Sequence, residues 1–378
     1  MRASVLPDAR LARHAGRFVW LSIDTENARN AGFLARYPVD TWPTFLVLAP
    51  RDGKPVLRWL GSATAAQLGE LLESARRSLA PRPGERRAEA LLARADRANA
   101  DGRLQEGIAG YREALKRGGV RWAARARAVM SLVLALAAAG ELEACATTAR
   151  REALQLGRGA SFASVVGMGL SCANAVPDAP WRARALAALE PLAREAVGVS
   201  GLLADDRAGL YEALVEARAT RGDDEGARRT AESWWSFLER ERGRPASAEA
   251  RASLDSWRVG AAIALGDPAR ALPALEASQR DLPRDYNPPA RRAYVLRELG
   301  RLPEARAAAE QALAKAYGPR KLKVYQLAAS IQEKQGDRPA LAATLEEAIE
   351  YANGLPAPQR DEKVASALRA KSGAIQGQ

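Results

Sequence analysis

The residues that most often carry chemistry are scarce in this chain. It has 378 residues, of which one is histidine and two are cysteine. A zinc site normally needs four suitable ligands, and a disulfide-rich secreted scaffold needs several cysteine pairs. We therefore expect no metal site, no cofactor and no disulfide framework. The single histidine, His14, follows Arg13 and is predicted to lie at the surface rather than in a catalytic centre.

Aromatic residues and long apolar runs are also few. Aromatic residues make up 6% of the chain, which argues against extensive β structure outside one short region. No stretch approaches 18 uninterrupted apolar residues, so we expect no membrane span. The first 17 residues, MRASVLPDARLARHAGR, lack the apolar core of a signal peptide.

Charge is plentiful but mixed in sign. The 57 basic and 45 acidic residues give a net charge of +12, and no long block of one sign stands out. A basic chain can bind nucleic acid. Because the two signs alternate along this one, we expect a solvated, arginine-rich surface and no nucleic-acid partner.

The composition favours helices arranged as more than one compact core. Ala, Arg and Leu dominate the sequence. A length of 378 residues predicts either two domains or an extended repeat array.

The region 18–60 differs from the rest of the chain. The runs FVWLSI (18–23), TFLVL (44–48) and VLRWL (56–60) are apolar and predict three strands, with a turn at 51–54 between the last two. Helical patterns span 27–36 and 64–79. We expect a small domain over 1–80, followed by a linker at 81–87.

Beyond the linker, glycine-based breaks recur at intervals of 34 to 44 residues or twice that. Glycine adopts the left-handed conformation that ends a helix, and the residues that follow suit the start of the next helix. The breaks are Gly102, Gly140, Gly222, Gly266, Gly300 and Gly336, with a further break expected near Pro177-Asp178. They predict seven helix pairs, at 88–118, 120–157, 160–197, 203–242, 247–282, 287–317 and 320–353.

These pairs resemble tetratricopeptide repeats. The segments DGRLQEGIAGYREAL (101–115) and LGRLPEARAAAEQAL (299–313) have the break glycine, then small and large residues at helical spacing. QGDRPALAATLEEAI (335–349) matches less well, and the pair at 160–197 is degenerate. The resemblance implies a solenoid over 88–355, with a C-terminal helix and tail over 356–378. Such solenoids serve many partners, so the family implies protein binding without naming the partner.

Residues 18–72 resemble the C-terminal half of a thioredoxin-like domain. The matching features are Asp24 after a strand, Tyr37-Pro38-Val39, Trp42-Pro43-Thr44 before a strand, the 52–54 hairpin and Gly61. The resemblance implies that Pro43 is a cis-proline, and that Trp42, Pro43 and Thr44 border a groove for an extended peptide. Trp42 could equally be an aromatic residue packed at a turn.

The redox motif of that family, two cysteines two residues apart, is absent, as are the first two strands. Without the central strand, the runs 18–23 and 44–48 would have unpaired edges unless they pair with each other. We therefore expect a natural start upstream of Met1, and the first proteolytic cleavage between 1 and 85. The compartment stays open: cytoplasmic as the chain stands, periplasmic if an upstream segment carries a signal peptide.

The sequence thus predicts a mainly α fold: a solenoid of about seven helix pairs after a small, incomplete α/β segment. The leading function is a scaffold that binds proteins or peptides in the solenoid groove and has no enzymatic activity. The alternative is a thiol–disulfide oxidoreductase or redox chaperone whose Cys-x-x-Cys lies upstream of Met1. The oligomeric state is not predicted.

We expect the groove to be lined by the first helix of each pair. Alignment on the break glycines places nine residues there: Leu92, Asp96, Met130, Leu134, Met168, Glu212, Glu216, Tyr294 and Gln326. Met130, Leu134 and Met168 are interpreted either as an adaptable apolar patch or as packing between helices. No Lys and Asn pair stands at the aligned positions, so we do not expect the groove to hold a partner's C-terminal carboxylate.

Cys145 and Cys172 fall on adjacent antiparallel helices, at equal distance from the turn 157–159. This places them at the same height along the two helix axes. A disulfide requires Cα atoms within about 7 Å and converging side chains. The pair is interpreted as two buried thiols, as a structural disulfide, which requires an oxidising compartment, or as a redox-active pair.

Overall fold

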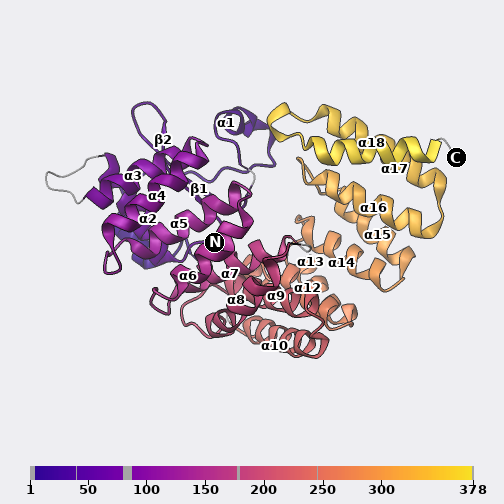
Figure 1. Cartoon of the computed structure of the whole chain (residues 1–378). Helices are drawn as coiled ribbons and strands as arrows, with labels where there is room; N and C mark the ends of the chain where they lie inside the picture. Colours follow the sequence, from indigo (N-terminus) through magenta and orange to yellow (C-terminus); the bar gives the residue numbers. More distant parts are fainter. Residues whose placement is uncertain (1–4, 40, 80–86, 177–178, 245, 377–378) are drawn as a thin grey trace. The chain divides into compact units, whose positions relative to one another are not determined.

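The computed structural model describes the chain except for residues 1–4, 40, 80–86, 177–178, 245 and 377–378. Nearly all of the expected linker at 81–87, and the expected break at Pro177-Asp178, therefore lie outside the described residues. The described residues form two compact units (Figure 1). The first contains Met1–Phe18 and Thr41–Phe237, and the second contains Val19–Asp40 and Leu238–Gln378.

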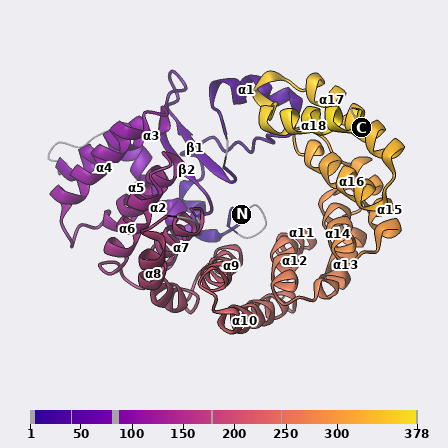
Figure 2. The ribbon, with the colours of Figure 1, turned by 45° about the vertical axis from the view of Figure 1, so that its right-hand side comes forward.

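Paired antiparallel helices make up most of both units, as the sequence predicts (Figure 2). In the first unit the pairs are α3 (Arg87–Ala100) with α4 (Leu104–Gly118), α5 (Arg125–Ala138) with α6 (Leu142–Ala153), α7 (Ala160–Asn174) with α8 (Arg182–Ala196), and α9 (Ala204–Thr220) with α10 (Asp224–Arg242). The boundary between the units falls inside α10.

The second unit continues the same pattern with one irregular pair. That pair consists of α11 (Ala248–Ala252), α12 (Asp255–Ala264), η3 (Pro268–Ala271) and α13 (Leu272–Asp281). It is followed by α14 (Asn287–Glu298) with α15 (Leu302–Leu313), then α16 (Lys321–Gln335) with α17 (Arg338–Gly354), and finally η4 (Ala357–Gln359) and α18 (Glu362–Gln376). The chain is thus a tetratricopeptide-like helical repeat array, preceded by a small two-stranded sheet.

The glycine breaks end helices in the way that the sequence predicts. At the first break Gly102 has φ 79°, the N–H of Arg103 donates to Ala98 O, and the N–H of Gly102 donates to Asn99 O. These two bonds are the Schellman arrangement, which satisfies carbonyls left over at the end of a helix. The same pair of bonds and a positive φ occur at the other five breaks, Gly140, Gly222, Gly266, Gly300 and Gly336.

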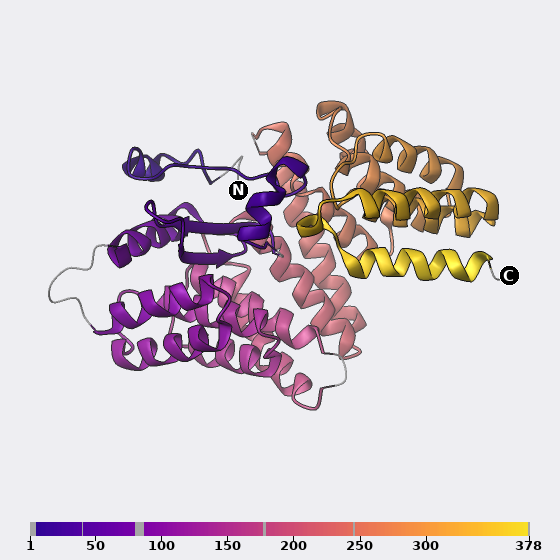
Figure 3. The ribbon, with the colours of Figure 1, turned by 90° about the horizontal axis from the view of Figure 1, so that it is seen from above.

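The sheet is a single antiparallel hairpin of β1 (Thr44–Leu48) and β2 (Pro55–Leu60), drawn as the two arrows in Figure 3. Thr44 pairs with Leu60 and Val47 with Leu57. The hairpin is followed by α2 (Ala65–Leu79) and preceded by the short η1 (Ala9–His14). Its buried residues, such as Trp59, belong to one apolar core that runs on through α3 to α9. The hairpin is therefore the start of the repeat core and has no separate core of its own.

The expected strand at 18–23 is wrong. These residues form no strand, and Val19 and Leu21 are 88% and 74% exposed. They do not pair with 44–48 either, since β1 pairs with β2. A strand needs a neighbouring strand for its backbone hydrogen bonds, and β1 pairs with β2 instead of with this run. The helical pattern at 27–36 is confirmed as η2 (Ala28–Asn30) and α1 (Ala31–Arg36), which belong to the second unit.

None of the described helices is long and apolar enough to cross a membrane. Among the described residues, no three or more His, Cys, Asp or Glu side chains are grouped so as to hold a metal ion.

Candidate functional site

The segment Asp24–Asn30 is laid along the last repeats of the second unit. Its own turn is local: Asp24 Oδ1 accepts from the N–H of Glu26 at 2.9 Å, and Asn30 Nδ2 donates to Asp24 O at 2.8 Å. Glu26 accepts the backbone N–H of Arg320 at 2.9 Å and lies 3.3 Å from the Arg320 guanidinium. Burial raises the pKa of Glu26, and the contacts with Arg320 oppose that rise.

Side chains of the repeats also bind the backbone and side chains of this segment. Gln359 of η4 donates its amide N–H groups to Thr25 O at 2.7 Å and Asn27 O at 3.0 Å. The Tyr317 hydroxyl donates to Asp24 Oδ2 at 3.1 Å. Just beyond the segment, α1 packs against η4, as Figures 1 and 2 show. The repeats therefore hold this turn through two of its carbonyl groups and two of its acidic side chains.

Gly318, in the turn between α15 and α16, makes this close approach feasible. Its φ is 61°, and a Cβ atom at this position would lie 2.7 Å from Glu26 Cα. No real Cβ contact is that short, so a side chain here would push the segment away. Tyr351 fixes the turn from the other side, because its hydroxyl donates to Gly318 O at 3.3 Å.

A pocket of about 730 Å³ lies between this segment and the helices that hold it. One wall is Glu26 to Ala28. The others come from the turn between α15 and α16, from α16 and α17, and from the Gly354–Gln359 region. They include three tyrosines, Tyr317, Tyr325 and Tyr351. Three carboxylates line the pocket, those of Glu26, Glu347 and Glu350, and no Lys or Arg is among its lining residues.

Tyr325 and Tyr351 lie side by side, here called the aromatic corner, and the ammonium group of Lys321 lies close to both rings. The ring centroids of Tyr325 and Tyr351 lie 6.1 Å apart. The Lys321 ammonium is 5.7 Å from the first centroid and 5.2 Å from the second, within range of a cation–π interaction. Burial raises the pKa of both tyrosines, so the rings stay neutral at physiological pH.

Several residues predicted to line the groove are instead buried in the first unit. Leu92, Asp96, Met130 and Leu134 are all 7% exposed or less. Asp96 accepts the guanidinium of Arg127 at 2.8 Å and the Tyr111 hydroxyl at 3.0 Å, and so joins α3, α4 and α5. A partner could reach these side chains only by displacing helices, which favours packing between helices as the role of Met130 and Leu134.

The other predicted groove residues are more accessible. Glu212 and Glu216 are exposed on α9, and Met168 on α7 is partly exposed and packs against the core. In the second unit, Tyr294 and Gln326 are partly exposed, and the Arg297 guanidinium stacks 4.7 Å from the Tyr294 ring centroid. None of these residues lines the pocket.

The Trp42-Pro43-Thr44 region has the local features that the resemblance implies, without the sheet around them. The Trp42–Pro43 peptide bond is cis, and Trp42 is 50% exposed. Thr44 begins β1, and its hydroxyl donates to Thr41 O at 2.6 Å. Peptide binding at these three residues stays a prediction.

Cys145 on α6 and Cys172 on α7 are both buried and joined as a disulfide. Their Cα atoms are 6.3 Å apart. The antiparallel arrangement about the turn at 157–159 therefore brings the two side chains together, and of the interpretations given above the free thiols do not agree with the structure.

His14 is buried, so its expected surface position is wrong. It ends η1, which packs on α2: a Cβ at Gly69 would lie 3.6 Å from His14 Nε2, and Arg13 Nε donates to the same nitrogen at 3.2 Å. Burial, with help from Arg13, lowers the pKa of His14 and favours the neutral ring. Gly69, which lies 55 positions further along the chain, leaves room for the His14 ring. No residue close to His14 in the sequence indicates that the ring is buried.

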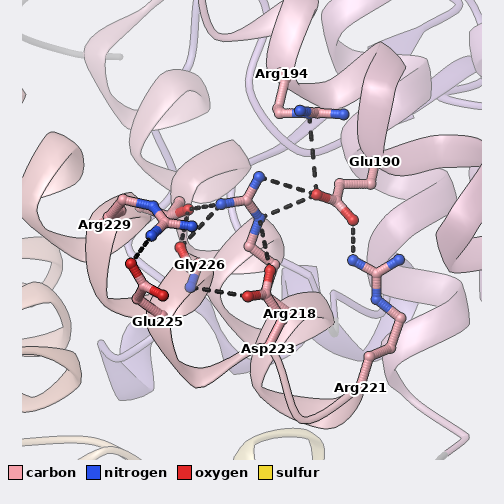
Figure 4. Close-up of polar contacts among 9 residues, drawn as sticks. Glu190, Arg194, Arg218, Arg221, Asp223, Glu225, Gly226 and Arg229 are labelled. Carbon is pink, nitrogen blue, oxygen red and sulfur yellow. Dashed lines mark hydrogen bonds and ion pairs between the residues drawn. The ribbon is translucent and has the colours of Figure 1, made fainter.

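A dense ion network around Glu190 has a structural role (Figure 4). The carboxylate of Glu190 on α8 accepts a hydrogen bond from Arg218 Nε at 3.0 Å. It also forms ion pairs with Arg221 and, at 3.9 Å, with Arg194. Arg218 also donates to Gly226 O at 2.9 Å and Thr230 Oγ1 at 3.0 Å on α10. The network joins α8, α9 and α10, and among the described residues its charges are paired with one another, which favours a structural role over ligand binding.

Comparison with known proteins gives weak similarity to repeat proteins. No family model matches the sequence, and no curated protein is significantly similar to it. Among solved structures, the chain is similar to a tetratricopeptide repeat protein from Parabacteroides merdae, with 11% identity, 75% of this chain and 98% of that chain covered, and a TM-score of 0.47.

Two further structures are similar at lower TM-scores. One is the complex of the TPR2AB domain of yeast Sti1 with pHSP90, with 16% identity, 76% and 98% coverage and a TM-score of 0.29. The other is the APC/C hetero-tetramer Cut9–Hcn1, with 14% identity, 81% and 57% coverage and a TM-score of 0.35. These scores carry no argument about function, and the assignment of the fold rests on the chain's own helix pairs and glycine caps.

Proposed function

We propose that this protein is a protein-interaction scaffold whose last repeats bind an extended segment of a partner protein in the pocket beside Tyr317, Tyr325 and Tyr351. The observation that carries the proposal is the binding of the chain's own Asp24–Asn30 segment by these repeats. The pocket next to it is open and large enough for several side chains.

Filling the pocket provides the test. Gly354 lines the pocket, and a Cβ atom there would meet nothing within 4 Å. Gly373 on α18 is equally unhindered and is not a lining residue. Immobilised full-length chain, Gly354→Trp and Gly373→Trp are compared for the proteins that they retain from an extract of the source cells, quantified by mass spectrometry.

We expect the unmodified chain and Gly373→Trp to retain the same partner, and Gly354→Trp to retain at least tenfold less of it. Equal retention by all three would overturn the assignment of partner binding to this pocket. Circular dichroism of each variant checks that the repeats are folded.

The thioredoxin-like region has a smaller place in this proposal. We retain it as a redox-inactive remnant whose Trp42-Pro43-Thr44 would contact a second extended peptide. The half-exposed Trp42 next to the start of β1 supports this idea. If Trp42→Ala retains every protein that the unmodified chain retains, in equal amount, this second peptide site is dismissed.

A further inference from the structure

The pocket in the second unit has a chemical preference that can be derived from the groups that line it. We propose that it binds the guanidinium group of an arginine in a partner protein. This inference rests on the proposed function and specifies what the partner presents. Three observations carry it: unpaired carboxylates, an unsatisfied buried acceptor, and aromatic faces that already attract a cation.

The carboxylates of Glu347 and Glu350 lie one turn apart on α17 and line the pocket. Within the described part of the chain, neither forms an ion pair or a hydrogen bond, whereas Glu26 on the opposite wall is paired with Arg320. With no basic residue lining the pocket, the two unpaired charges favour a cation from outside.

Gln359 supplies an independent observation. Its side chain is buried, with the residue 5% exposed, and it lines the pocket. Its Nε2 donates to the two carbonyls of the segment, which fixes the orientation of the amide and leaves Oε1 as an acceptor. Oε1 has no hydrogen-bond partner in the described residues, and a buried acceptor of this kind is costly until a donor reaches it.

The aromatic corner completes the match. Lys321 places its ammonium within cation–π range of the Tyr325 and Tyr351 rings, so these faces are accessible to a cation. A guanidinium carries five N–H donors in a planar fork, so it can bind a carboxylate and an amide oxygen at once while its plane stacks on a ring. The single point charge of a lysine matches this set less well. Lys321 is a competitor for the same rings, and its removal should favour the ligand.

Fluorescence anisotropy with the full-length chain at low ionic strength tests the inference. The probe is a labelled nine-residue Gly/Ser peptide that contains Arg-Gly-Arg, compared with the same peptide containing citrulline, which keeps the shape and loses the charge. The test variant is Glu347→Gln/Glu350→Gln, and its control is Glu346→Gln, which removes an exposed charge from the same helix outside the pocket. Lys321→Gln is paired with Lys334→Gln, an exposed lysine on the same helix.

We expect the arginine peptide to bind at least tenfold more tightly than the citrulline peptide. Binding should fall at least tenfold in the double variant and stay within twofold in Glu346→Gln. Lys321→Gln should tighten binding several-fold and Lys334→Gln should not. Equal binding of both peptides, or an equal loss in Glu346→Gln, would overturn the inference, as would choline binding at the same concentration as the arginine peptide. If Gly354→Trp still abolishes partner capture in that case, the proposed function stands and arginine recognition alone fails.

Discussion

At the scale of single residues, the partly buried carboxyl group of Asp206 makes the stability of the fold depend on pH. It lies in the first turn of α9, and the Ser62 hydroxyl donates to its Oδ1. Burial raises its pKa from 3.8 to about 6. A carboxyl group whose pKa is higher in the folded state stabilises the fold while it is protonated. That contribution is complete below pH about 4 and is lost as the pH rises through about 6.

Asp206→Asn should therefore become more stable than the unmodified chain as the pH increases. The difference in the free energy of unfolding should grow by about 2 to 3 kcal/mol between pH 4 and pH 8, since one pKa unit corresponds to about 1.4 kcal/mol. Urea unfolding of both proteins at several pH values measures this. Because the Ser62 hydroxyl lowers the pKa of Asp206, Ser62→Ala should move the transition to higher pH. A difference that does not vary with pH would contradict the assignment.

Individual residues were also where prediction from the sequence failed most often. Asp96 and His14 look like surface residues in a sequence because they are polar. The partners that cover them, Arg127 for Asp96 and α2 near Gly69 for His14, lie 31 and 55 positions away. Helical spacing determines which face of a helix a residue occupies. It does not show whether the next helix covers that face. Leu92, Met130 and Leu134 were predicted to line a groove for this reason, and neighbouring helices bury them instead.

At the scale of elements, the helix pairs could be predicted well because their signals are local. A glycine with positive φ lies one or two residues after the end of each of six helices, α3, α5, α9, α12, α14 and α16, where the sequence predicts the breaks. The break expected near Pro177-Asp178, after α7, lies outside the described residues. The prediction of a strand at 18–23 was wrong because a strand depends on a neighbouring strand that is often distant in the sequence. The composition of the run gives no information about such a neighbour. The pocket could not be predicted for the same reason: Glu26 and Glu347 are separated by more than 300 positions in the sequence.

The Asp24–Asn30 segment should detach when Gly318 gains a side chain. Gly318→Ala places a Cβ atom against Glu26, whereas Gly336→Ala meets nothing within 4 Å. Both glycines have positive φ, at 61° and 71°, so the two variants carry the same kind of backbone penalty, about 1 kcal/mol. Hydrogen exchange in peptides covering 24–30 should accelerate at least tenfold in Gly318→Ala alone. Equal exchange in both variants would mean that the segment is not held at this turn.

The disulfide between α6 and α7 should stabilise the first unit. It closes a loop with a sequence separation of 27, for which loop-closure entropy predicts about 3 to 4 kcal/mol. Peptide mapping of protein alkylated at isolation, without reduction, should find Cys145 linked to Cys172. Cys145→Ala/Cys172→Ala should unfold at a lower urea concentration. Recovery of both cysteines in alkylated form would show two buried thiols instead.

At the scale of the whole molecule, the run that links the two parts of the N-terminal region should be cleaved first. Trp20 and Leu21 are 46% and 74% exposed and lie outside any helix or strand. Chymotrypsin cleaves after such residues, and the stretch 80–86 contains no aromatic residue or leucine to compete. Brief digestion should produce a cut after Trp20 or Leu21, detected by mass spectrometry. First cuts within 290–350 would contradict this order of stability.

The division of the chain into parts was harder to anticipate than its repeats. Residues 1–80 read as one small domain. In the structure Val5, Leu11 and the hairpin share the core of the first repeats, and the described residues from Val19 to Val39 belong to the second unit. The residues around 24–30 contain no local signal for the helices that hold them. The division into 1–80, 81–87, 88–355 and 356–378 stays a prediction.

The most direct test of the account is the footprint of a bound partner on the full-length chain. The partner captured through the Gly354-sensitive interaction is added back, and hydrogen exchange is measured with and without it. The account predicts slower exchange at 24–30, 317–325 and 347–359, which surround the pocket in the second unit. Protection confined to the predicted groove helices of the first unit, at 92–96, 130–134 and 212–216, would contradict it.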